Sequence, residues 1–183
     1  MNLPRAVTET VTPYRILVVE GHEGLRRACL YAELALLGFP SRQPPDGLHH
    51  LDPTRPFRDL LAAPGRFVVD GGIIGELVYG PLRRGRSRVT WIQVLDLAEA
   101  VAEREGALVH LTGGDHGDDG SESAAAALAY ARVFRTLAQH VPVVRVDVTS
   151  ARTDVVAERT RRIRAPAPHL SQLRRSTRQL TIG

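Results

Sequence analysis

Short apolar runs alternate with segments of helical periodicity along most of this chain. Runs rich in β-branched residues predict buried strands, because parallel strands covered on both faces are apolar at nearly every position. Between them, apolar residues recur at helical spacing. The expected strands are 14–20, 66–70, 107–111 and 141–148. The expected helices are 24–37, 56–63, 90–105, 121–139 and 152–163, with a helical turn over 73–79.

This alternation predicts a three-layer α/β fold with a doubly wound, mostly parallel sheet. Ligands of such folds bind beyond the carboxyl ends of the strands. Those ends are expected at Glu20, Asp70, Leu111 and Asp147. Any functional site should therefore include residues at or just after these positions.

Helix 90–105 also carries a prediction about its buried face. Its apolar residues should face the sheet, and the expected buried positions are Ile92, Leu95, Leu97 and Val101.

A chain of 183 residues predicts a single domain. We expect a flexible N-terminus over 1–13, the α/β domain over 14–164 and a basic C-terminal tail over 165–183. No acid follows Glu158, whereas seven arginines do. This end therefore carries a charge of +7, and the rest of the chain carries −3, which gives the net charge of +4. Such a segment could bind nucleic acid or an acidic protein partner, or it could be a solvated extension.

The chain contains no lysine, and all 24 of its basic residues are arginine. Codon drift in a GC-rich genome or selection against a modifiable amine would each produce this bias. Arginine does not replace lysine where a compact point charge is needed.

Cysteine usage and hydropathy predict a soluble cytoplasmic protein. The single cysteine, Cys29, excludes an internal disulfide, and its place in the first long helix predicts a buried thiol. No apolar run is long enough to span a bilayer, and residues 1–13 lack the pattern of a signal peptide. We therefore expect no membrane association.

The first strand runs into a glycine turn and a helix, which is the layout of a phosphate-binding P-loop. The P-loop pattern is G-x-x-x-x-G-K-[ST], and Gly21 occupies its first glycine. A glycine turn that only closes the strand–helix connection would give the same spacing. The candidate nucleotide- or phosphate-binding residues are Gly21, His22, Glu23, Gly24, Leu25, Arg26 and Arg27.

Two further segments carry candidate chemistry. Asp70 ends the second strand, where P-loop enzymes place an acid associated with Mg²⁺, so Asp70 is the candidate metal-binding residue. Arg27 and Asp70 are the candidate catalytic residues. The segment 75–88 is rich in arginine, which binds phosphate well, although it could equally be a solvated basic loop. The candidate acceptor-binding residues are Glu76, Tyr79, Arg83, Arg86 and Arg88.

Over about 15–163 the chain resembles the thymidylate kinase group of nucleoside monophosphate kinases, and most closely its phage-type members. The resemblance rests on Glu20-Gly-His-Glu-Gly24 for the group's E-G-x-[DE]-G, on Val68-Val-Asp70 before its D-R motif, on Gly75-Glu-Leu-Val-Tyr-Gly80 with the Arg-Gly-Arg loop, and on Val143-Val-Arg-Val-Asp147. It implies a P-loop fold, ATP, Mg²⁺, a nucleoside monophosphate acceptor and often a homodimer.

The departures from this family fall on its catalytic positions. Arg26 stands for the last P-loop glycine, Arg27 for the lysine and Ala28 for the threonine that binds Mg²⁺. Gly71 stands for the arginine of D-R. The lid segment 112–123 has no arginine and four acids, which would repel a triphosphate.

The sequence therefore predicts a degenerate thymidylate kinase-like protein that binds nucleotide or phosphate with impaired or lost phosphoryl transfer. Its role would be regulatory or scaffolding, as a homodimer. One alternative is an active nucleoside monophosphate kinase that uses ATP, with Arg27 in place of lysine. Another is a nucleic-acid-associated protein acting through its arginine-rich tail.

Overall fold

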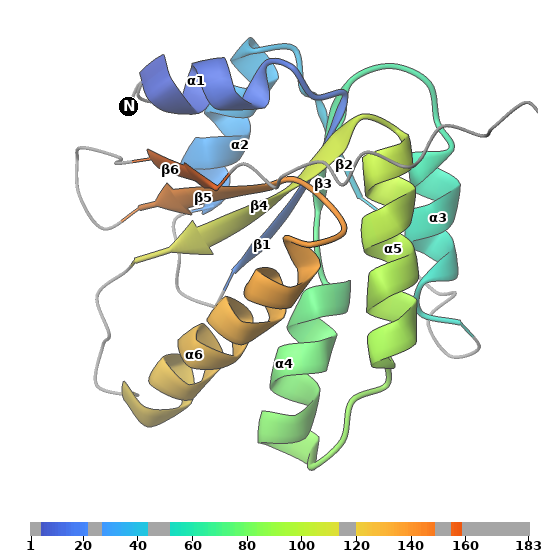
Figure 1. Cartoon of the computed structure of the whole chain (residues 1–183), viewed down its shortest axis with the longest axis vertical. Coiled ribbons are helices and arrows are strands. Elements are labelled where there is room, and N and C mark those ends of the chain that lie inside the picture. The colour runs from blue at the N-terminus through green and yellow to red at the C-terminus, as the bar shows by residue number, and fades with distance from the viewer. Residues whose placement is uncertain (1–4, 22–26, 44–51, 114–119, 149–154, 159–183) are drawn as a thin grey trace, which may run out of the picture.

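The computed structural model describes residues 5–21, 27–43, 52–113, 120–148 and 155–158. These residues form a three-layer α/β fold around a six-stranded sheet of order β2-β3-β1-β4-β5-β6 (Figure 1). β1 to β5 are parallel, and β6 is antiparallel to β5. The strands are β1 Ile16–Gly21, β2 Ser41–Arg42, β3 Phe67–Asp70, β4 Gly106–Thr112, β5 Val143–Asp147 and β6 Val155–Glu158. The predicted fold class is confirmed.

Helices cover both faces of this sheet (Figure 1). Side chains of successive strand residues point to opposite faces, so the apolar strands supply two separate clusters of buried residues. α1 and α2 pack on one face, and α3 to α6 pack on the other. The helices are α1 Arg5–Val11, α2 Arg27–Leu36, α3 Arg55–Leu61, α4 Ile73–Arg84, α5 Trp91–Glu103 and α6 Gly120–Leu137.

Both ends of the described chain differ from the prediction. The flexible N-terminus predicted over 1–13 is wrong for α1, whose Val7 and Val11 are buried against the sheet. The helix predicted over 152–163 is wrong for 155–158, which pair with the free edge of β5 as strand β6. An isolated apolar segment does not reveal that an unpaired strand edge lies beside it in space. The tail over 165–183 lies outside the described residues.

The face of α5 was also predicted incorrectly in part. Thr90 caps this helix in a capping box with Gln93, and the residues that then face the sheet are Val94, Leu97, Ala98 and Val101. Ile92 lies two residues before Val94, on the opposite side of the helix, and its side chain is 69% exposed. Leu95 is half-buried.

Helix α4 is longer than predicted, and helix α2 buries different residues than predicted. The helical turn predicted over 73–79 is the start of α4, which continues through Pro81 to Arg84 and ends at Gly85, a glycine with φ of 71°. In α2, Leu30 and Leu34 supply the inward face, so Cys29 is exposed and the prediction of a buried thiol is wrong.

The connections of the sheet define where a ligand would bind. The chain builds β2 and β3 on one side of β1 before it crosses to β4 and β5 on the other side. The carboxyl end of β1 therefore lies at the point where the winding direction changes, which is where open α/β sheets bind ligands.

Candidate functional site

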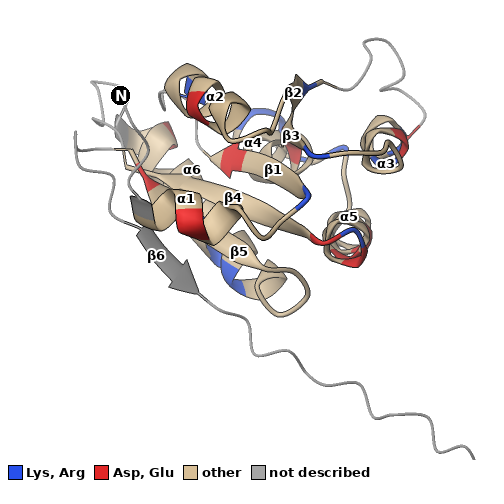
Figure 2. Ribbon diagram, turned by 90° about the horizontal axis from the view of Figure 1, so that it is seen from above, with Lys and Arg blue, Asp and Glu red and all other residues tan. Residues whose placement is uncertain are grey.

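Glu20, the residue before the last of β1, hydrogen-bonds to the start of α4. The alternation of β1 directs Glu20 to the same face as Ile16 and Val18, and its side chain is 1% exposed. In Figure 2, seen from above, the strands are mostly tan and the carboxyl end of β1 is red. Oε1 of Glu20 accepts hydrogen bonds from the backbone N–H groups of Gly72, at 2.7 Å, and Ile74, at 3.0 Å. The carboxyl group thus satisfies N–H donors at the N-terminus of α4, where a helix has no partners of its own.

Burial dominates the ionisation of Glu20. Removal from water raises the pKa of this carboxyl to about 7, although the N–H groups of Ile74 and Gly72 and the charge of Arg27 act in the opposite direction. The group therefore titrates near neutral pH instead of staying ionised.

Glu20 also explains the glycine after Asp70. A β-carbon at residue 71 would lie 2.4 Å from Cδ of Glu20, far inside van der Waals contact. With Glu20 in this position, a larger side chain at residue 71 would force the Glu20 side chain or the backbone to shift.

Arg27, which the family resemblance aligns with the P-loop lysine, is partly buried and bonds to other groups of the protein. It is the first residue of α2, and its Nη1 donates to Oδ1 of Asp70 at 3.2 Å. Its Nη2 donates to the backbone carbonyl of Gly21 at the end of β1. Burial works against the charged guanidinium, but Glu20 and Asp70 outweigh it and raise the pKa of Arg27.

A third group completes this cluster. The hydroxyl of Tyr31, one turn after Arg27 on α2, donates to Oδ1 of Asp70 at 2.7 Å. Burial and the Asp70 carboxylate raise the pKa of Tyr31, so the phenol keeps its proton as a donor. We refer to Arg27, Tyr31 and Asp70 as the α2–β3 cluster.

These residues do not fit a Mg²⁺ site. The Asp70 oxygen Oδ1 accepts from a guanidinium and a phenol, and Ala28 has no side-chain oxygen to offer as a ligand. Among the described residues, no three His, Cys, Asp or Glu side chains are grouped so that they could hold a metal ion.

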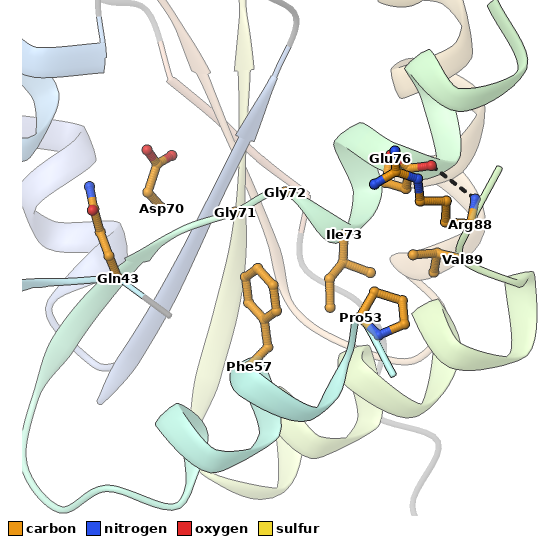
Figure 3. Close-up of a pocket in the computed structure, with 10 residues that line it drawn as sticks. All are labelled: Gln43, Pro53, Phe57, Asp70, Gly71, Gly72, Ile73, Glu76, Arg88 and Val89. Carbon is orange, nitrogen blue, oxygen red and sulfur yellow. Dashed lines mark hydrogen bonds between the residues drawn. The ribbon is translucent and has the colours of Figure 1, made fainter. Parts of the chain in front are cut away.

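A pocket of about 410 Å³ opens beside the end of β3. Figure 3 shows Gln43 and Asp70 at one end, Glu76 and Arg88 at the other, and Phe57 and Ile73 between them. Its volume lies within the roughly 300–1,000 Å³ of small-molecule sites. The bare backbone of Gly71 and Gly72 forms part of its wall.

The structure brings two of the acceptor candidates, Glu76 and Arg88, to this pocket. Oε1 of Glu76 accepts from the backbone N–H of Arg88 at 2.9 Å and from the side chain of Arg84. Glu76 therefore ties α4 to the segment that precedes α5.

The other acceptor candidates do not line it. Arg83 stacks 4.4 Å from the ring centre of Tyr79, and its guanidinium donates to Glu122 of α6 at 2.7 Å and 2.9 Å. Arg86 is exposed on the loop after α4 and is not among the residues that line the pocket.

Some site residues were missed, and others cannot be placed. Tyr31 could have been found, because it lies four residues after Arg27 and so shares its helix face. Gln43 and Phe57 carry no sequence signal that links them to Asp70. The phosphate-binding candidates His22, Glu23, Gly24, Leu25 and Arg26 lie outside the described residues, as does 114–119 of the predicted lid.

The comparisons with known proteins bear on the three-layer α/β fold. No family model and no curated protein matches the chain. A similar solved structure is that of YorR protein from Bacillus subtilis in complex with phosphorylated GDP, with a TM-score of 0.58 and 16% sequence identity, covering 73% of this chain and 85% of that one. At this identity the likeness establishes the fold alone and does not single out the thymidylate kinase group. Within the described part of the chain, no helix is both long and apolar enough to cross a membrane.

Proposed function

We propose that this protein is a nucleotide-binding member of the P-loop kinase-like fold in which phosphoryl transfer is impaired or lost. The α2–β3 cluster carries the proposal. Arg27, which would face phosphate, is bound to Asp70 and to the carbonyl of Gly21. The charges expected to act on phosphate and metal neutralise each other instead.

Two other departures act in the same direction. Ala28 removes a hydroxyl ligand, and Gly71 removes a guanidinium from the acceptor side. Phosphoryl transfer depends almost wholly on positioning and charge neutralisation. Because removal of a single preorganised donor costs on the order of 10²–10³ in rate, these losses together would leave little activity.

Nucleotide binding itself draws on other features. The N-terminus of α2 follows the carboxyl end of β1, where backbone N–H groups and the helix dipole favour an anion. YorR protein, which shares the fold, is in complex with phosphorylated GDP. A protein that binds nucleotide without rapid turnover would suit a regulatory or scaffolding role, as a cytoplasmic homodimer.

Calorimetric titration with ATP, ADP, GDP and dTMP, each with and without Mg²⁺, tests binding. Coupled assays of ATPase and phosphotransfer activity test turnover. We expect binding of at least one nucleotide, little dependence of its Kd on Mg²⁺, and no turnover above background. If none of the nucleotides binds, the proposal is wrong.

The rival function, an active kinase that uses Arg27, predicts turnover that Arg27→Ala abolishes. Arg132→Ala, on the exposed surface of α6, is the matched control and should leave any turnover unchanged.

A further inference from the structure

The pocket beside β3 offers little to a phosphate group. The segment 83–88 contains four arginines, but Arg83 is bound to Glu122 and Arg84 to Glu76. Arg88 is the arginine that lines the pocket, and Gly71 in its wall has no side chain. A nucleoside monophosphate would place a doubly charged group in a pocket whose one lining arginine is Arg88 and whose carboxylates, Asp70 and Glu76, already pair with Arg27 and Arg84.

The two carboxylates suit hydrogen-bond donors. Among the described residues, the hydrogen bonds of Asp70 end on Oδ1 and those of Glu76 end on Oε1. Each carboxylate has a second oxygen that can accept from a ligand. Gln43 adds an amide with both a donor and an acceptor.

The middle of the pocket suits a flat apolar body. The ring of Phe57 and the side chain of Ile73 lie between the two polar ends (Figure 3). An aromatic ring gains from stacking beyond the area that it buries. A heterocyclic base has this flat body and N–H donors at its edge, and a sugar adds hydroxyl donors.

We propose that this pocket binds an unphosphorylated nucleoside in preference to a nucleoside monophosphate. The inference rests on the proposed function, which supplies nucleosides and nucleotides as the ligand class. The base lies against Phe57, and donors of the base or the sugar bond to Glu76 and Asp70. The acceptor side of the site thus lacks the arginine that would bind phosphate, and it presents carboxylate oxygens that accept hydrogen bonds from the ligand.

The test is calorimetry with the four common ribonucleosides, the four deoxynucleosides and the corresponding 5′-monophosphates. We expect at least one nucleoside to bind with a smaller Kd than its monophosphate. Glu76→Gln should weaken this binding about tenfold, the effect of losing a charge-assisted hydrogen bond. Glu103→Gln, the same substitution on the exposed end of α5, should leave Kd unchanged.

Equal or tighter binding of the monophosphate, no binding of any nucleoside, or an unchanged Kd in both Glu76→Gln and the more conservative pocket variant Phe57→Leu would overturn the inference. Titration of the same preparation with ATP and GDP separates this failure from failure of the proposed function. If ATP or GDP binds while nucleosides do not, only the inference is lost. If nucleosides bind while no nucleotide does, the inference survives and the proposed nucleotide binding is wrong.

Discussion

The side chain of Glu20 occupies the space that a side chain at residue 71 would need, since a β-carbon on Gly71 would lie 2.4 Å from Cδ of Glu20. Gly71→Ala should therefore destabilise the fold by about 1–3 kcal/mol, the usual cost of overpacking. Denaturant unfolding measures this change. In a Glu20→Ala background the clashing atoms are absent, so the same Gly71→Ala substitution should cost much less. Equal costs in the two backgrounds would contradict the proposed steric link.

Glu20 should also make stability depend on pH. Its pKa is about 7 in the folded state and 4.5 in a solvated chain, so between these values the folded state holds a proton that the unfolded state has released. This contribution is fully present below pH 4.5, is lost as pH rises to about 7, and amounts to about 3 kcal/mol. The free energy of unfolding should show this fall in denaturant titrations from pH 5 to pH 8.

Glu20→Gln isolates that contribution. Glutamine cannot ionise, and its Oε1 can still accept from Gly72 and Ile74, so the variant should be more stable than the native protein at pH 8 and similar to it at pH 5. Greater stability of the native protein at pH 8 would show that an ionised carboxylate is required there.

The α2–β3 cluster should show measurable coupling. Arg27 and Asp70 are partly buried, with side chains 26% and 35% exposed, so their ion pair is better shielded than a surface pair. A double-mutant cycle with Arg27→Met and Asp70→Asn should give a coupling free energy of about 1–2 kcal/mol. The exposed pair of Arg83 and Glu122 is a matched comparison and should couple by less than about 0.5 kcal/mol. If the coupling free energy between Arg27 and Asp70 is as small as that between Arg83 and Glu122, Asp70 does not neutralise Arg27 as proposed.

The orientation of α5 predicts that substitution of two of its apolar residues changes the free energy of unfolding by very different amounts. Leu97→Ala should cost about 2–5 kcal/mol, because Leu97 is 3% exposed and packs in the core. Ile92→Ala should change stability by no more than about 0.5 kcal/mol, because that side chain is 69% exposed. Thermal or denaturant unfolding of Ile92→Ala distinguishes this register from the one that the sequence pattern predicts, because that pattern buries Ile92 as well as Leu97.

Local patterning was sufficient for much of this fold. The apolar strands β1, β3, β4 and β5, the helices between them and the parallel three-layer arrangement follow from residue types that a buried sheet requires. The P-loop layout placed Arg27 at the start of α2, and the acid that ends β3 placed Asp70 at the same edge of the sheet. These features depend on neighbours in sequence, which a pattern can report.

The remaining features depend on contacts between distant segments. Pairing with β5 made 155–158 a strand, and the packing of Val94, Leu97, Ala98 and Val101 in the core leaves Ile92 on the outer side of α5. The bonds of Arg27 to Asp70 and of Glu20 to the start of α4 join residues more than 40 positions apart. The sequence by itself determined that Arg27, Ala28 and Gly71 stand where the family resemblance implies lysine, threonine and arginine. Only the tertiary structure decided that Glu20 fills the space at Gly71 and that Asp70 neutralises Arg27, because burial and charge pairing depend on which groups meet in space.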